Sequence, residues 1–345
     1  MNNKRNLIII LSTILFTCIS CAHDSSFEEE IYIHMDVDSI NNESQPRTKD
    51  SVPSSNTTLP GLDNTTQSNG SYHIDSLFNI NNHSIIVTDI INYMYQTPTV
   101  ASAQGAAAYG DYLFQFKDRN AGLYIYNLKK KTFVKMITLT SNNNNHCNQA
   151  SFSDIFYQDN DQFPLLYVSG GKSGTYNHVQ VYRIIGTEES IAIQQVQEII
   201  LPKTTDQNWV SWTCCILDNE NHYLYAYASN NSTRLIKFDI PDCHQETISL
   251  NDYDIIDYIP IDHIAHQQGG IIRKGFFYMI FGVPAWGDQV WLRIFNLNGK
   301  KEYIRYNLSE KGFPREPESL FFYNNELYAI TNNIGIYKIC FKKEN

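Results

Sequence analysis

Residues 104–139, QGAAAYGDYLFQFKDRNAGLYIYNLKKKTFVKMITL, contain the repeat on which the fold prediction rests. Small and polar residues open the stretch. Three runs rich in Tyr, Phe, Leu and Ile follow, separated by Gly, Asn, Asp and Lys. Aromatic and branched residues favour pleated strands, and the residues between them are those that form tight turns. The stretch therefore predicts a meander of short strands.

The same order of segments returns four more times along the chain. Units begin at residues 104, 146, 212, 268 and 316, so their spacings are 42, 66, 56 and 48 residues. A four-stranded propeller blade takes about 40–50 residues, and insertions lengthen some blades. We therefore predict an all-β chain that forms a β-propeller of about five four-stranded blades.

The unit that begins at residue 316 shows only three strands. Ser84-Ile85-Ile86-Val87, which precedes the first unit, has the composition of a strand. An N-terminal strand in the last blade would close the ring and leave no open sheet edge. A pair of β-sandwich sheets is the alternative, but it does not explain the repeated order of segments.

In blade pattern, residues 80–343 resemble the lipid-anchored β-propellers with TolB-like or NHL-like blades of bacterial envelopes. The resemblance lies in the order of strands and turns, and no diagnostic motif contributes to it. It implies the propeller fold and an envelope lipoprotein. It implies no particular ligand or reaction.

The first 20 residues have the composition of a lipoprotein signal peptide. Lys4 and Arg5 precede an apolar stretch at residues 7–16. That stretch is too short to span a bilayer, because a spanning helix needs about 20 apolar residues. Cys18-Ile19-Ser20-Cys21 follows and resembles a lipobox, with Cys18 where Leu is usual. Cleavage before Cys21 and its lipidation, with palmitate among the acyl groups, would anchor the chain. Cleavage nearby by an ordinary signal peptidase is the alternative.

Residues 21–79 are predicted to be a disordered polar tether, because residues 41–70 contain almost nothing apolar to bury. Glu28, Glu29 and Glu30 resemble the surface-export signal that follows the lipidated cysteine in some Gram-negative anaerobes, or they are simply solvated. The predicted divisions are a signal peptide at 1–20, a tether at 21–79 and a propeller at 80–345. The expected location is the outer membrane, on its periplasmic or cell-surface side.

The remaining cysteines do not form a disulfide framework. Removal of Cys18 and lipidation of Cys21 leave five: Cys147, Cys214, Cys215, Cys243 and Cys340. Their number is odd and their spacing irregular. Cys214 and Cys215 are neighbours on a predicted strand, so they face opposite sides and cannot bridge each other without distortion. The sequence leaves open whether one disulfide forms among these cysteines, and between which of them.

Charge and motifs exclude several function classes. The formal net charge of −10 argues against a nucleic-acid partner, because phosphate binding needs a clustered basic face. The sequence contains no Gly-x-Ser-x-Gly, no His-Glu-x-x-His and no Walker loop, and outside the lipobox-like residues 18–21 it has no Cys-x-x-Cys pair that could bind zinc. No familiar catalytic class is therefore indicated by a motif.

The leading residues of the five units carry the candidate site. The first strand of each propeller blade lines the central channel, so residues that open the units are expected to meet near one mouth. These residues are Gln104, His146, Asn148, Trp212, Gln268, Glu316 and Glu318. Polar groups of these kinds around one opening are typical of a small-ligand site. The alternative is a wet mouth whose polar groups bond only one another and water.

Two function classes fit this arrangement. We favour a non-catalytic binding module for a protein, peptide or glycan, because the sequence shows no dense cluster of carboxylates or histidines. The alternative is a propeller hydrolase, lactonase or cyclase, with His146 as general base and Glu316 or Glu318 as acid. Glu316, Glu318 and Asn148 also offer the oxygen ligands that Ca²⁺ takes. No other cofactor is expected, and the chain is expected to be a monomer.

Overall fold

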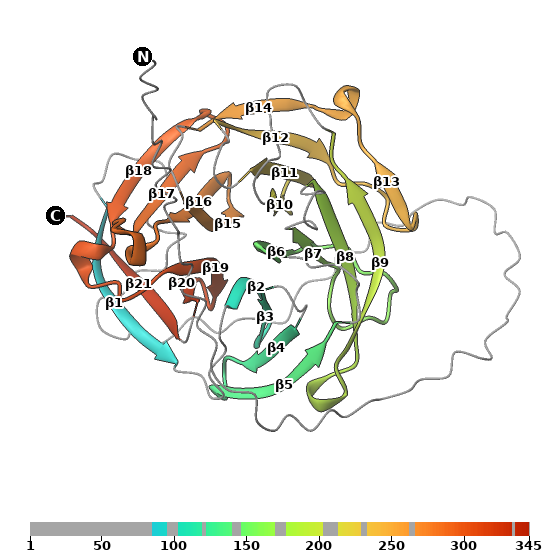
Figure 1. Cartoon of the computed structure of the whole chain (residues 1–345), viewed down its shortest axis with the longest axis horizontal. Coiled ribbons are helices and arrows are strands. Elements are labelled where there is room, and N and C mark those ends of the chain that lie inside the picture. Colours follow the sequence, from blue (N-terminus) through green and yellow to red (C-terminus); the bar gives the residue numbers. More distant parts are fainter. Residues whose placement is uncertain are drawn as a thin grey trace, which may run out of the picture. The chain divides into compact units, whose positions relative to one another are not determined.

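The described strands form a ring of five sheets (Figure 1). The structure is a computed structural model, and it describes residues 85–94, 103–118, 122–139, 146–169, 177–202, 213–228, 233–261, 266–332 and 335–344. Each sheet contains a four-stranded antiparallel meander of the kind that the repeat predicts. The prediction of a five-bladed, all-β propeller is confirmed.

The blades follow one another along the chain. Blade 1 comprises β2 (Ala103–Tyr109), β3 (Tyr112–Lys117), β4 (Gly122–Asn127) and β5 (Thr132–Thr138). Blade 2 comprises β6 (Gln149–Phe152), β7 (Leu166–Ser169), β8 (His178–Ile185), β9 (Ala192–Ile200) and the added β13 (Thr247–Ser249). Blade 3 comprises β10 (Thr213–Asp218), β11 (Tyr223–Ala228), β12 (Arg234–Asp239) and β14 (Asp257–Pro260). Blade 4 comprises β15 (Gln267–Arg273), β16 (Phe276–Phe281), β17 (Trp291–Asn296) and β18 (Lys301–Asn307). Blade 5 comprises β19 (Pro317–Tyr323), β20 (Glu326–Thr331), β21 (Ile336–Lys343) and β1 (Ile85–Met94).

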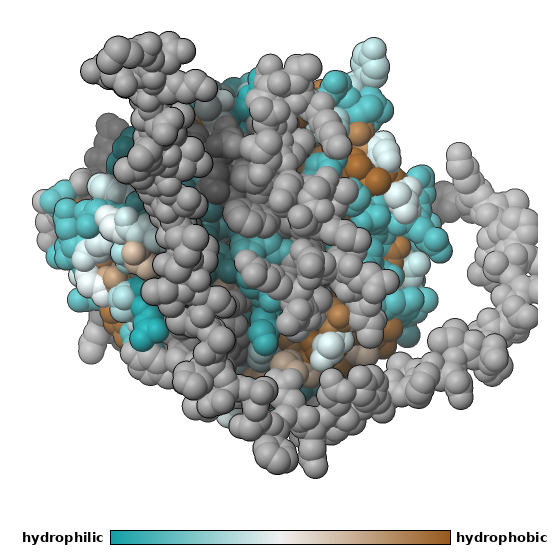
Figure 2. Space-filling view, in the orientation of Figure 1, coloured by the Kyte–Doolittle hydropathy of each residue, from teal (hydrophilic) through white to brown (hydrophobic). Residues whose placement is uncertain are grey.

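Short 3-10 turns connect some of these strands, namely η1 (Glu188–Ser190), η2 (Asp252–Asp254), η3 (Pro284–Trp286) and η4 (Ser309–Lys311). Within the described part of the chain, no helix is long and apolar enough to cross a bilayer. On the face drawn in Figure 2, hydrophilic residues cover much of the rim, with hydrophobic residues between them.

The first described strand completes the last blade, as predicted. β1 pairs antiparallel with β21, from Ile85 opposite Lys343 to Met94 opposite Ile336. The predicted segment, residues 84–87, covers only the start of this strand, which continues to Met94. The pairing covers the outer edge of β21, which would otherwise expose unpaired backbone groups.

The 56-residue spacing between the units that begin at 212 and 268 has a structural cause. β13 lies in the connection between β12 and β14 of blade 3, yet it pairs in parallel with β9, the outer strand of blade 2. The insertion in one blade therefore extends the sheet of its neighbour. The sequence repeat does not reveal this pairing, because β13 is only three residues long.

The hydrophobic core consists of five clusters, one between each pair of neighbouring blades. Cys214 belongs to the cluster between blades 3 and 4, whereas Cys215 belongs to the cluster between blades 2 and 3. The two side chains thus face opposite sides of β10, as expected for neighbours on a strand. Among the described residues, Cys147, Cys214, Cys215, Cys243 and Cys340 are all buried, and none of them is in a disulfide.

Candidate functional site

The inner strands β2, β6, β10, β15 and β19 surround the centre of the ring (Figure 1). We call the end of the channel where these strands begin the N-terminal mouth. It contains six of the residues predicted from sequence, which are Gln104, His146, Asn148, Gln268, Glu316 and Glu318. Trp212, the seventh, and the lipidation candidate Cys21 lie outside the described residues.

Three inner strands carry a one-residue bulge at this mouth. The pairing of β2 with β3 slips between Ala103 and Ala106, and that of β15 with β16 slips between Gln267 and Gly270. The pairing of β19 with β20 slips around Glu318. A bulge bends the strand and redirects a side chain, and bulges are frequent beside functional sites. Gln104, Gln268 and Glu318 all lie within these bulges.

Two glycines let neighbouring inner strands approach at this mouth. A Cβ atom on Gly105 would lie 2.6 Å from the carbonyl oxygen of Cys147, and one on Gly269 would lie 2.7 Å from that of Glu318. Both contacts are with backbone, which cannot move aside as a flexible side chain would. Gly105 and Gly269 therefore allow the inner strand of each blade to lie close to that of the next blade.

Glu316 is held at the mouth by two amides from different blades. Gln268 Nε2 donates to Glu316 Oε1 at 3.0 Å, and Asn332 Nδ2 donates to Glu316 Oε2 at 2.7 Å. Burial raises the pKa of Glu316, although these hydrogen bonds and the nearby His266 and His146 act in the opposite direction. Glu316 is thus a fixed, partly desolvated carboxyl group.

Glu318 is the more unusual carboxyl group. It is only 3 % exposed, and among the described residues no hydrogen bond or ion pair reaches its carboxyl. Burial, followed by the nearby carboxylates of Glu316 and Asp118, raises the pKa of Glu318 well above its ordinary value of 4.5. A buried carboxyl without a partner is costly when ionised, so Glu318 favours its neutral form.

Two histidine–aspartate pairs lie beside these carboxyls. His146 Nδ1 lies 2.7 Å from Asp118 Oδ1, and His266 Nδ1 lies 2.5 Å from Asp288 Oδ2. Both histidines act on the pKa of Glu316, which places them near it. His266 has a left-handed backbone with φ of 60°, a conformation that few non-glycine residues adopt. The mouth thus combines four carboxyl groups with two imidazoles.

The remaining predicted residues have different environments. Asn148 is buried and donates from Nδ2 to Cys214 Sγ at 2.7 Å, so it links blades 2 and 3. Gln104 is also buried, and no described residue hydrogen-bonds to its amide. Asn148 therefore has a structural contact, whereas the Gln104 amide keeps its capacity to bind.

Gln149, which the sequence did not single out, crosses the channel. Its Nε2 donates to the carbonyl of Gly270 at 2.9 Å, and its Oε1 accepts from the Gly270 N–H at 2.9 Å. Gln149 belongs to blade 2 and Gly270 to blade 4, which are not neighbours in the ring. This fully buried amide therefore spans the centre and separates the N-terminal mouth from the other end of the channel.

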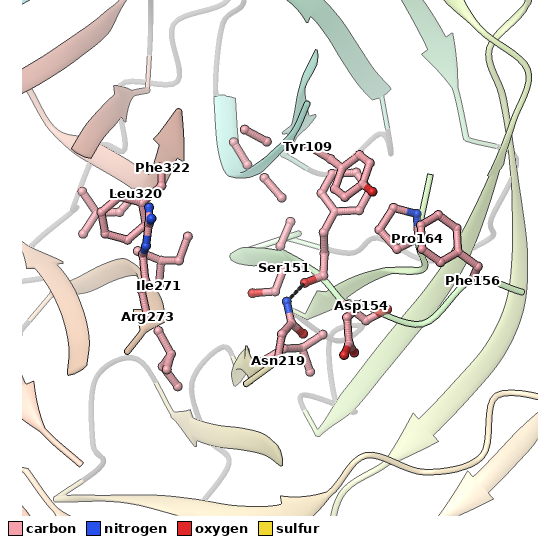
Figure 3. A pocket seen from close by; sticks show the side chains of 18 residues that line it. Tyr109, Ser151, Asp154, Phe156, Pro164, Asn219, Ile271, Arg273, Leu320 and Phe322 are labelled. Carbon is pink, nitrogen blue, oxygen red and sulfur yellow. Dashed lines mark hydrogen bonds between the residues drawn. The ribbon is translucent and has the colours of Figure 1, made fainter. Parts of the chain in front are cut away.

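The opposite end contains a cavity of about 380 Å³, which we call the C-terminal pocket. The ends of all five inner strands, or the residues just after them, contribute to its lining. Tyr109, Phe156 and Asp154 lie on one side and Arg273 with Phe322 on the other, and Asn219 lies between them (Figure 3). A cavity of this size is in the range that binds small ligands. The sequence prediction, which considered only the strand beginnings, missed it.

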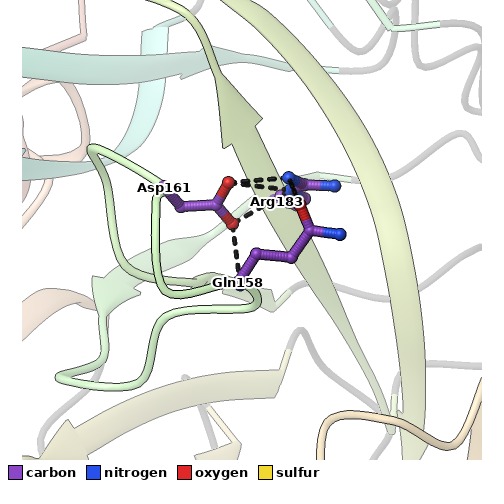
Figure 4. A network of polar contacts seen from close by, with 3 residues as sticks. All are labelled: Gln158, Asp161 and Arg183. Carbon is purple, nitrogen blue, oxygen red and sulfur yellow. Dashed lines mark hydrogen bonds and ion pairs between the residues drawn. The ribbon is translucent and has the colours of Figure 1, made fainter.

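A polar network holds one wall of this pocket. The segment between β6 and β7 carries Asp154 and Phe156, and Arg183 of β8 fixes it by binding Asp161 (Figure 4). Arg183 Nε lies 2.9 Å from Asp161 Oδ2, and its Nη2 lies 2.7 Å from Oδ1. Because the guanidinium group contacts both carboxylate oxygens, the relative orientation of the two side chains is fixed as well as their distance.

The N-terminal mouth does not gather a compact set of metal ligands. Among the described residues, only Asp242, Cys243 and His244 place three such ligand atoms within 4.8 Å of one another, and they lie in a loop between β12 and β13. Calcium binding by Glu316, Glu318 and Asn148 stays a prediction.

No protein-family model matches the chain, and no curated protein sequence matches it. Among solved structures, a glutaminyl cyclase from Myxococcus xanthus aligns over 76 % of this chain and 97 % of that chain, with 10 % identity and a TM-score of 0.48. A structural genomics protein of unknown function from Bacteroides thetaiotaomicron aligns over 76 % and 77 %, with 11 % identity and a TM-score of 0.43. At these values, a function must be argued from the residues of this chain.

Proposed function

We propose that the chain is a binding module whose N-terminal mouth takes a ligand with a protonated amine, such as the free N-terminus of a peptide or protein. The observation that carries this proposal is Glu318, a buried carboxyl that no described residue hydrogen-bonds, beside the fixed carboxyl of Glu316. An ammonium group supplies the positive charge that this pair lacks and the hydrogen-bond donors that Glu318 lacks.

The charges around the mouth favour a cation. Carboxyl groups of Asp118, Asp288, Glu316 and Glu318 lie there with two imidazoles. No lysine or arginine is among the described groups that shift the pKa of Glu316 or Glu318. An anionic ligand would add repulsion to a site that already disfavours charge on Glu318. A bound ammonium would instead lower the pKa of Glu318 and release its proton.

Two matched probes test the proposal, trialanine and its N-acetylated form, which differ in the charged amine. We expect trialanine to raise the melting temperature of the full chain at pH 7.5 and the acetylated form to leave it unchanged. Calorimetry in buffers of different ionisation enthalpy should detect proton release on binding. Glu316→Gln should weaken binding at least tenfold, whereas Glu310→Gln, an exposed control, should not. Equal binding of the two probes would contradict the proposal, and stabilisation by Ca²⁺ alone would favour a metal site.

A second candidate function is acid–base catalysis at the same mouth. Glu318, whose pKa burial raises well above 4.5, retains a proton that a general acid could donate, and His146 is oriented by Asp118 as a base would be. Glu318→Gln separates the two functions. A binding module should lose amine affinity and the accompanying proton release in this variant, whereas an enzyme should lose turnover while it still binds substrate.

We also propose that the chain is a monomeric outer-membrane lipoprotein, anchored through Cys21 and facing the periplasm or the cell surface. The lipobox-like Cys18-Ile19-Ser20-Cys21 and the polar residues after it support this proposal. Growth with radiolabelled palmitate should label the wild-type chain and not Cys21→Ser. Labelling of both forms, or of neither, would contradict lipidation at Cys21.

A further inference from the structure

The C-terminal pocket presents two exposed aromatic rings to solvent. Tyr109 is 37 % exposed and Phe156 is 41 % exposed, and their ring centroids lie 6.5 Å apart. The Tyr109 ring also packs against the Phe152 ring, with ring centroids 5.6 Å apart, and this contact fixes the position of Tyr109. Large aromatic side chains are usually buried for most of their surface, and a fixed, exposed pair at a cavity offers an apolar face to a ligand.

Hydrogen-bond acceptors and donors lie beside these rings. Asn219 Nδ2 donates to the carbonyl of Phe152 at 2.9 Å, while its Oδ1 is buried and no described group donates to it. A buried acceptor without a partner costs free energy, which a ligand donor would recover. Asp154 adds a second acceptor. On the opposite wall, the Arg273 guanidinium lies over the Phe322 ring, 4.7 Å from its centroid, and supplies donors.

We infer that the C-terminal pocket binds a carbohydrate, with the apolar face of one neutral pyranose ring on Tyr109 and the edge of that sugar ring against Phe156, whose ring stands at 79° to that of Tyr109. A pyranose combines a flat face of C–H groups with hydroxyl groups that both donate and accept. Its hydroxyls can donate to Asn219 and Asp154 and accept from Arg273. A cation would be repelled by Arg273 and an anion by Asp154, so a neutral ligand fits the pair of opposite charges best. The cavity of about 380 Å³ accommodates a ligand of this size.

The walls of the pocket are held in place before a ligand arrives. The Arg183–Asp161 contact fixes the segment that carries Phe156 and Asp154 (Figure 4). Arg273 Nη2 donates to Asn325 Oδ1 at 2.7 Å, which fixes the guanidinium over Phe322. Such preorganisation lowers the entropy that binding costs.

The inference does not depend on the function proposed for the N-terminal mouth. The buried Gln149 amide lies between the two ends of the channel and bonds Gly270 across it. Substitutions in the pocket should therefore leave amine binding unchanged. Substitutions of Glu316 should likewise leave carbohydrate binding unchanged.

Saturation-transfer NMR on the full chain, with glucose, galactose, mannose, maltose and cellobiose as probes, tests the inference. We expect at least one sugar to give transfer that is strongest on the C–H protons of one ring face. Tyr109→Ala and Asn219→Ala should each reduce its affinity at least fivefold, and Tyr109→Phe should retain it. Trp286→Ala is the matched control, because this indole is 71 % exposed and contacts His266 at the other end of the channel.

Three results would overturn the inference. One is the absence of transfer to any of the five sugars while folded protein is confirmed by circular dichroism. Another is equal loss of transfer in Tyr109→Ala and Trp286→Ala. The third is binding of phenylalanine amide in the pocket with no binding of sugars, which would assign the aromatic pair to a peptide side chain.

Discussion

The N-terminal mouth and the C-terminal pocket are built from the same five strands, yet their chemistry differs. At the mouth, carboxyl, amide and imidazole groups surround the buried Glu318. In the pocket, the aromatic rings of Tyr109, Phe156 and Phe322 contribute to a largely apolar lining. The difference follows from backbone geometry as well as from composition. Bulges in β2, β15 and β19 redirect polar side chains at the mouth, whereas the same strands pair in regular register where they reach the pocket.

One propeller can thus present different chemistry at the two ends of its channel. A regular strand alternates its side chains between the two neighbouring inter-blade clusters, so few of them face the channel. A bulge interrupts this alternation and exposes one residue to the channel without disturbing the rest of the blade. Four substitutions test this interpretation, in order of decreasing effect on stability.

Gly269→Val should have the largest effect, because its Cβ would lie 2.7 Å from backbone atoms of Glu318 and Ser319. We expect a loss of about 3 kcal/mol of unfolding free energy, measured by urea denaturation. Ala108→Val, a half-buried position at the pocket end of β2, is the matched control and should cost about 1 kcal/mol or less. Equal losses would mean that the blades are no closer at the mouth than at the pocket.

Gln149→Met should lower the unfolding free energy by about 2 kcal/mol, because the N–H and carbonyl of Gly270 lose their buried partner. Gln104→Met is the control, since no described residue hydrogen-bonds to that amide, and a change within about 0.5 kcal/mol is expected. If the two variants are equally stable, Gln149 does not hold blades 2 and 4 together.

Glu318→Gln should change how stability depends on pH. Because burial raises the pKa of Glu318 in the folded state, the folded chain binds this proton more tightly than the unfolded chain does. The unfolding free energy therefore falls as the pH rises above about 4.5 and through the folded-state pKa. Glu318→Gln removes the part of this decline that Glu318 causes. The difference in unfolding free energy between the variant and the wild type should therefore be more favourable to the variant at pH 8 than at pH 4. Parallel pH profiles for both proteins would show that Glu318 titrates normally.

Phe156→Ala should have the smallest effect on stability, about 0.5–1 kcal/mol, because the ring is 41 % exposed. Its effect should instead appear in carbohydrate affinity, measured by the same NMR titration as for Tyr109→Ala. A large loss of stability with unchanged affinity would assign Phe156 to packing and remove it from the proposed site.

The fold and one end of the channel follow from local sequence patterns. The aromatic runs of blade 1 and the small-residue opening at Gln104 predict strands, and their repetition predicts blades. Gln268, Glu316 and Glu318 were found because each begins a unit. The partners Asp118, Asp288 and Asn332 were missed, since each lies in a turn or strand end whose sequence gives no sign of what it faces.

Gln149 and the C-terminal pocket could not be predicted for a different reason. The backbone at Cys147 is left-handed, with φ of 51°, just before β6 begins. This interrupts the alternation of side chains along the strand. The position of His146 therefore does not indicate which of the following residues points into the channel. The pocket depends on where five strands end relative to one another. Its segment at Asp154 and Phe156 is positioned by Arg183, which comes about 30 residues later in the sequence.

The closure of blade 5 by β1 has a consequence for how these molecules associate. β1 comes first and β21 last among the described strands, and their pairing joins the two ends of the ring. The same hydrogen bonds form equally well when β1 comes from a second copy of the chain, which is the condition for strand exchange. A protease that cuts between β1 and β2 would leave β21 ready to accept such a strand. Dimers linked by exchanged β1 strands should therefore accumulate as the protein concentration rises during refolding.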